Sequence, residues 1–138
     1  LTNTYPVNRE RMRTVLTSIE GEYIDGRHIR GGLKFSTPNG AAYVPLMPFQ
    51  VWIIFGIYGF DEALADGTRR RLCGEAHIFI TRKSGKTELG AALDVAEVVA
   101  LGPANAQVLI CANSKEQSKI AFKAVKQFAY QLDPKSTN

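Results

Sequence analysis

The pattern of apolar residues predicts a strand, a tight loop and a helix in the second half of the chain. Residues 76–80 are a short apolar run of the kind found in buried strands, and residues 108–112 are a second one. Between them, apolar side chains recur at helical spacing and predict a helix over residues 86–101, which Gly102-Pro103 would end: Leu89, Leu93, Ala96 and Ala100. We therefore expect one right-handed strand–helix–strand unit with parallel strands.

Local signals predict the elements around this unit. Asn39-Gly40 is a strong turn signal, Pro48 suits the first position of a helix, and Ser114 with Gln117 forms a capping box. The expected elements are a helix over 8–19, a hairpin of 33–36 and 42–45, a helix starting at Pro48 and a last helix after Ser114. The stretches expected to be irregular are 21–32, 61–68 and the tail 133–138.

The residues between the first predicted strand and its helix resemble a phosphate-binding loop. Residues 80–87 read Ile-Thr-Arg-Lys-Ser-Gly-Lys-Thr, and the full motif has a glycine where Ile80 stands. A helix N-terminus offers unpaired N–H groups and partial positive charge to a polyphosphate. Gly85 permits close backbone approach, Lys86 can reach the β- and γ-phosphates, and the Thr87 hydroxyl can hold Mg²⁺. The alternative is an ordinary turn with a solvated Lys86.

Segments in the right order and spacing resemble the ATPase domain of the large terminase subunit of tailed double-stranded DNA phages and prophages. Residues 82–87 resemble a loop variant of that family without the first glycine, with Ser84 replacing Asn and Thr87 replacing Ser. Residues 46–50 resemble its adenine-recognition segment, and residues 108–117 resemble the strand and helix start that follow its phosphate loop. The resemblance covers roughly residues 43–132.

This resemblance implies a fold, cofactors and partners. The fold would be α/β, a partial P-loop three-layer sandwich of parallel strands with flanking helices over residues 43–138. Residues 1–42 would form a small α+β region of helix and hairpin before it. The cofactors would be ATP and Mg. The partners of the full-length protein would be double-stranded DNA, the portal protein, the small terminase subunit and further copies of the chain.

The resemblance also implies a role for each residue of the site. Gln50 would read adenine through its amide, which donates and accepts like the edge of the base. The backbone of residues 84–87, with Ser84 and Gly85, would cradle the phosphates, Lys86 would neutralise their charge, and Thr87 would hold Mg²⁺. Arg82 would add positive charge near the γ-phosphate and favour the transition state. As an alternative, Gln50 is a polar residue on a surface helix.

The acidic residue that phosphoryl transfer needs is not identifiable after the loop. The strand over 108–112 ends without a carboxylate, whereas an Asp must hold Mg²⁺ and another group must orient water. Asp61-Glu62 ends an apolar run but precedes the loop, and Asp94 is expected to point away from it. The missing acid and the nuclease domain would lie beyond Asn138, so we expect ATP binding without motor-like hydrolysis from this chain alone. Another P-loop NTPase (helicase-like or kinase) and a nonenzymatic prophage-derived DNA- or protein-binding fragment are the alternatives.

Composition and charge narrow the class of protein. The chain is 45% hydrophobic and 22% charged, as in ordinary globular domains, and its net charge is +4. The lysines of the last helix can face DNA or only solvent, and the arginines at residues 69–71 can face DNA, a neighbouring subunit or only solvent. Neither a signal peptide nor an apolar run of ~18 residues is evident. We expect a soluble protein of the bacterial host cytoplasm, with no membrane contact and with Cys73 and Cys111 as free, buried thiols.

Overall fold

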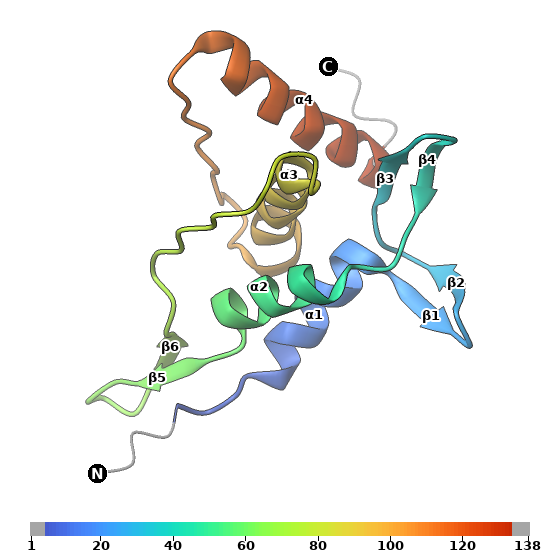
Figure 1. Cartoon of the computed structure of the whole chain (residues 1–138). Coiled ribbons are helices and arrows are strands. Elements are labelled where there is room, and N and C mark those ends of the chain that lie inside the picture. Colours follow the sequence, from blue (N-terminus) through green and yellow to red (C-terminus); the bar gives the residue numbers. More distant parts are fainter. Residues whose placement is uncertain (1–4, 134–138) are drawn as a thin grey trace.

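The computed structural model of the chain describes residues 5–133. Figure 1 shows helices packed against one another in the centre of the molecule and short β-hairpins around them. The elements are α1 (Arg9–Glu20), β1 (Glu22–Ile24), β2 (Arg27–Arg30), β3 (Lys34–Thr37), β4 (Gly40–Tyr43), α2 (Pro48–Tyr58), β5 (Asp61–Ala63), β6 (Arg69–Arg71), α3 (Lys86–Ala96), the π-helical turn η1 (Glu97–Leu101) and α4 (Lys115–Leu132).

The helix predictions are confirmed at most of their boundaries. α1 begins after Asn8, whose side chain accepts a hydrogen bond from the backbone N–H of Arg11. α2 begins at Pro48, and α4 begins after Ser114, whose hydroxyl accepts from the Gln117 N–H. The helix expected over 86–101 is α3 continued by η1, because its last turn widens from α- to π-helical geometry.

The predicted parallel strands are not formed among the described residues. All the strands in this part of the chain pair as antiparallel hairpins, in the orders β1-β2, β3-β4 and β5-β6. Residues 76–80 and 108–112 pair with no other strand, and Figure 1 draws both as a thin tube without an arrow. Phe79 is 92% exposed and Leu109 is 87% exposed. An apolar run records what its side chains prefer, whereas a strand also needs a hydrogen-bonded neighbour, so neither the strand–helix–strand unit nor the three-layer sandwich is present here.

Two stretches that we expected to be irregular contain hairpins. β1 and β2 lie within residues 21–32 and are joined by Asp25-Gly26, which have φ of 48° and 75°. Two residues with positive φ make a turn that matches the twist of the strands, and Asp-Gly is a known signal for it. β5 lies within residues 61–68 and pairs with β6. The hairpin β3–β4 was correctly predicted, and Gly40 follows its turn at φ 104°.

The core lies where α3 packs against α1 and α4, with α2 packed on α1. Small side chains along α3 allow this close approach, and Phe35 of β3 meets Phe128 of α4 edge-to-face at 5.3 Å between ring centroids. Leu132, the last residue of α4, is 45% exposed. The largest fully buried side chains are those of Tyr58, Phe128, Ile19, Leu33, Ile54, Leu89 and Val15.

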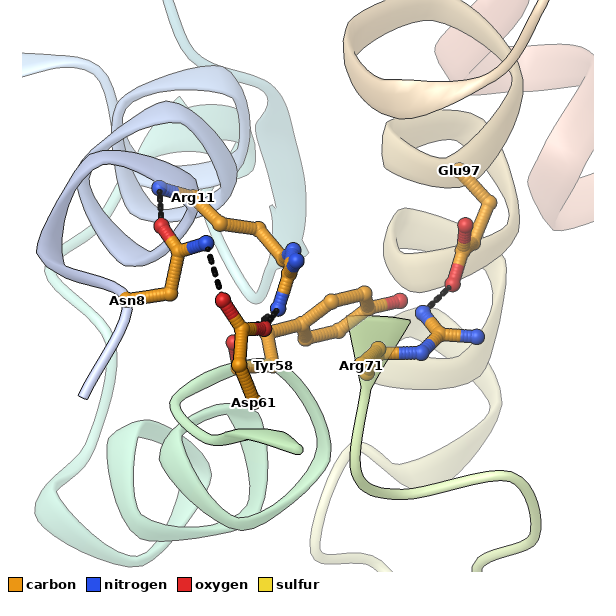
Figure 2. Close-up of polar contacts among 6 residues, drawn as sticks. All are labelled: Asn8, Arg11, Tyr58, Asp61, Arg71 and Glu97. Carbon is orange, nitrogen blue, oxygen red and sulfur yellow. Dashed lines mark hydrogen bonds and ion pairs between the residues drawn. The ribbon is translucent and has the colours of Figure 1, made fainter. Parts of the chain in front are cut away.

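A polar network fastens α1 to the segments that precede the phosphate loop (Figure 2). The Arg11 guanidinium donates to the Asp61 carboxylate at 2.5 Å, and the Asn8 amide donates to the same carboxylate at 2.8 Å.

A second polar cluster surrounds Tyr58 at the end of α2. Arg71 forms an ion pair with Glu97 and lies over the ring of Tyr58, 5.1 Å from its centroid. Burial, and then the charge and hydrogen bond of Glu97, raises the pKa of the Tyr58 phenol.

The expectations about the cysteines and about membrane helices can be compared with the structure. Both cysteines are free thiols, but neither is buried: Cys73 is half-buried, and Cys111 is exposed because the segment that carries it is not covered by a sheet. Within residues 5–133, every helix is too short or too polar to cross a membrane. The proposed division into residues 1–42 and 43–138 stays a prediction, and the tail from 134 onward lies outside the described residues.

Candidate nucleotide-binding site

The predicted phosphate loop is a compact turn that ends in the first residue of α3. The Ser84 hydroxyl donates to the Thr81 carbonyl at 2.6 Å, which closes the turn. Lys83 has φ 64° and Gly85 has φ 74° with ψ 17°, so the chain passes through the left-handed region twice. A positive φ costs little at a glycine, which has no β-carbon, but it is uncommon for other residues such as Lys83. A side chain at position 85 would therefore strain the turn.

Gly85 is the residue from which α3 starts. Its carbonyl accepts the first helical hydrogen bond, from the Leu89 N–H at 2.9 Å, and no side chain caps the helix there. The first-turn N–H groups of a helix have no intrahelical acceptor, so they are available to an anion. Lys86 and Thr87 occupy that turn with exposed side chains. The local geometry therefore suits phosphate, as the sequence predicts.

A groove of about 330 Å³ runs along α3 from this turn. Lys86 and Thr87 line one end of it, and Ile78 and Ile80 of the extended segment line its side. Asp94, expected to point away from the loop, lines the same groove further along α3. Burial, followed by the negative charge of Glu97, raises the pKa of the Asp94 carboxyl.

Gln50, predicted to read adenine, lies beside the phosphate loop. Its Nε2 is 3.9 Å from the position that a β-carbon on Gly85 would take. Its Oε1 accepts a hydrogen bond from the Met47 N–H at 2.8 Å, so the amide also holds the start of α2. The fold thus brings together two residues 35 positions apart in the chain, and it leaves the donor end of the amide next to Gly85.

The positive charge of the site comes from the loop itself. Arg82, Lys83 and Lys86 are exposed within five consecutive residues, 82–86. Glu88 is the nearest acid, and its Oε1 accepts from the Ser36 N–H at 3.2 Å. Sequence reasoning missed this contact with β3, because nothing in a local pattern marks a contact between residues 52 positions apart.

The residues present fit a magnesium ion only when it is shared with a ligand. Within residues 5–133, no group of three or more His, Cys, Asp and Glu side chains is placed to hold a metal ion. Mg²⁺ keeps waters and binds through few protein oxygens plus substrate phosphates. The Thr87 hydroxyl at the first turn of α3 supplies one such oxygen, so the arrangement fits a nucleotide-bound Mg²⁺ rather than a metal held by protein alone.

The acids proposed and rejected as catalytic groups have structural partners. Asp61 binds Arg11 and Asn8 and is 3% exposed, and Glu62 pairs with Arg70 at 2.5 Å. These contacts agree with leaving Asp61-Glu62 out of the site. His77, in the extended segment before the loop, lies on the surface with its Nε2 2.9 Å from the Glu75 carboxylate.

Comparison with known proteins identifies one family. The family model described as "Terminase large subunit, ATPase domain" matches residues 48–137. No curated protein and no solved structure matches the chain. The matched region includes Gln50, the phosphate loop and α3, which form the candidate site, and it continues through α4. This chain belongs to the family of terminase large subunit ATPase domains.

Proposed function

We propose that this chain is the ATP-binding part of a motor ATPase that moves double-stranded DNA into a viral capsid. The observation that carries the proposal is the position of Gln50 beside Gly85, at the start of α3. A base-reading amide next to a phosphate-binding turn is the minimum that an adenine nucleotide needs. Family membership supports the P-loop type of fold and ATP as the nucleotide.

In this proposal each loop residue has one task. The N–H groups of residues 84–87 bind phosphate oxygens, and Lys86 neutralises the charge on the β- and γ-phosphates. Thr87 binds Mg²⁺, which supplies further positive charge to the phosphates when bound. Arg82 is exposed on the loop, and its task is to add positive charge near the γ-phosphate. Portal protein, the small terminase subunit, DNA and further copies of the chain are the partners proposed for the motor.

Binding of Mg·ATP to the 138-residue chain is the direct test. We expect saturable binding of Mg·ATP in titration calorimetry, and weaker binding of Mg·GTP, because a guanine edge does not match the Gln50 amide as adenine does. Circular dichroism of the same sample checks that the chain is folded. A folded chain that takes up neither nucleotide contradicts the proposed function.

Substitution of Gln50 tests base reading separately from folding. Gln50→Ala removes both ends of the amide, and with them the hydrogen bond that holds the Met47 N–H. Gln50→Glu keeps an acceptor for Met47 and removes the donor beside Gly85. We expect both variants to lower the affinity for ATP more than that for GTP, by roughly tenfold.

The two variants differ in stability, which makes one the control for the other. Only Gln50→Ala is expected to lower the melting temperature, because only it leaves the Met47 N–H at the start of α2 without its acceptor. If Gln50→Glu weakened ATP and GTP binding equally, Gln50 would not read the base, and its role would be only to hold the start of α2 through Met47.

A further inference from the structure

The outer edge of β3 is bound by side chains rather than by another strand. Gln131 of α4 makes two hydrogen bonds to Lys34: its Oε1 accepts from the Lys34 N–H at 2.7 Å, and its Nε2 donates to the Lys34 carbonyl at 3.0 Å. Two residues along, the Ser36 N–H donates to Glu88 of α3. In the register of β3 with β4, Lys34 and Ser36 lie on the same edge, so one strand is held by two helices.

These two contacts connect β3 to different parts of the molecule. Gln131 lies in the last turn of α4, near which Figure 1 shows β3. Glu88 lies in the first turn of α3, directly after Thr87 of the phosphate loop. Phe35 lies between Lys34 and Ser36 in the strand, and its side chain packs on Phe128 of α4. The strand is therefore fixed to α4 at one residue and to the nucleotide site at another.

The hairpin also leads to the base-reading residue. β4 pairs with β3 along its whole length, and α2 starts at Pro48, after residues 44–47. Gln50 lies in the first turn of α2. Glu88, the residue next to Thr87, thus joins the first turn of α3 to the hairpin from which the chain continues into α2 and Gln50.

We infer that Glu88 is a positioning residue, which keeps the base-reading amide of Gln50 at the correct distance from the phosphate loop through its hydrogen bond to Ser36. The inference rests on the proposed ATP binding. It assigns Glu88 no contact with the nucleotide: its negative charge opposes phosphate, whereas its oxygen holds β3. Loss of that oxygen would uncouple the two halves of the site without removing either.

The test compares Glu88→Ala with Glu88→Gln in the 138-residue chain, with Mg·ATP and Mg·tripolyphosphate as ligands. Both variants remove the same negative charge, so both change tripolyphosphate affinity alike. Only Glu88→Gln keeps an oxygen that accepts from the Ser36 N–H. We expect the ratio of ATP to tripolyphosphate affinity to fall about tenfold in Glu88→Ala and to stay within about twofold of the original in Glu88→Gln.

Gln131→Ala is the control for a general weakening of the hairpin. It removes both bonds to Lys34 on the same strand edge, so it lowers the melting temperature, and it leaves Glu88 in place. Its affinity ratio is expected to stay unchanged. A ratio that falls as far in Gln131→Ala as in Glu88→Ala would overturn the inference, because hairpin stability alone would then explain the effect.

Ser36→Pro removes the donor instead of the acceptor. Proline is tolerated on an outer strand edge, where its missing N–H breaks no ladder bond. We expect Ser36→Pro to lower the ratio of ATP to tripolyphosphate affinity as Glu88→Ala does. The chain that carries both substitutions should show no further fall in this ratio. Additive effects, or an unchanged ratio in Glu88→Ala, would refute the inference. Absence of binding by both ligands to the original chain would instead refute the proposed function.

Discussion

Replacing Lys86 by Ala is expected to weaken Mg·ATP binding by roughly tenfold to more than a hundredfold. A charge-assisted hydrogen bond to phosphate is worth about 1.5–3 kcal/mol, and every 1.4 kcal/mol is tenfold in affinity. Lys86 is exposed in the first turn of α3, so its removal takes away no core contact. The loss should therefore appear in binding and not in stability, as measured by calorimetry and thermal unfolding of the same variant.

A lysine elsewhere separates a local contact from general electrostatic attraction. Lys123 is exposed on α4, and Lys123→Ala lowers the net charge by the same amount. Its affinity for Mg·ATP is expected to stay within about twofold, because Lys123 lies outside residues 82–87 and an exposed charge that makes no direct contact with phosphate is weakened by salt. Unchanged affinity in folded Lys86→Ala would show that residues 82–87 form an ordinary turn and not a phosphate loop.

The second large effect concerns stability. Replacing Arg11 by Ala is expected to lower the free energy of unfolding by about 3–5 kcal/mol, the range for removing one partner of a buried ion pair. The Asp61 side chain is 4% exposed, and that of Arg11 is 20% exposed. Removal of Arg11 leaves a buried carboxylate with one hydrogen bond, from the Asn8 amide, and the more distant positive charge of Arg69 to compensate it. Urea unfolding, followed by circular dichroism, measures the change.

An exposed ion pair and a neutral isostere provide the controls. Arg30 pairs with Glu22 at side-chain exposures of 76% and 41%, so Arg30→Ala should lower the stability far less than Arg11→Ala does. Asp61→Asn, added to Arg11→Ala, removes the buried charge and should restore part of the lost stability. Equal effects of Arg11→Ala and Arg30→Ala would mean that burial of Asp61 contributes nothing.

The same ion pair sets the direction of a pH dependence. Burial alone would raise the pKa of Asp61, but the hydrogen bonds from Arg11 and Asn8 and the positive charge of Arg11 lower it overall. A carboxyl with a lowered pKa in the folded state stabilises the fold above its unfolded pKa of about 3.9. That contribution is lost as the pH falls through the folded pKa, and it should be absent from acid unfolding of Asp61→Asn.

Local signals predicted much of the backbone. Pro48 starts α2, Ser114 caps α4, and Asn39-Gly40 lies at the β3–β4 turn, because each of these acts within a few residues. Asp25-Gly26, at the β1–β2 turn, is a signal of the same kind, although it lies among further glycines and charged residues that are typical of a loop. The strands over 76–80 and 108–112 were wrong for a different reason, since strand pairing depends on a partner and not on the run itself.

The amino-acid sequence is enough to identify the family and to predict the phosphate-loop residues and the helix after them, because a glycine, a lysine and a threonine at fixed spacing carry their chemistry with them. In contrast, the position of Gln50 beside Gly85 and the hydrogen bond from the edge of β3 to Glu88 follow from the packing of the folded chain and from no local pattern. Gln50 and Gly85 are 35 positions apart in the chain, and Ser36 and Glu88 are 52 positions apart. Both contacts arise because α2, α3 and the hairpin pack around a shared core. Hydrophobic periodicity records which face of each element is buried, but it does not record which element lies against that face.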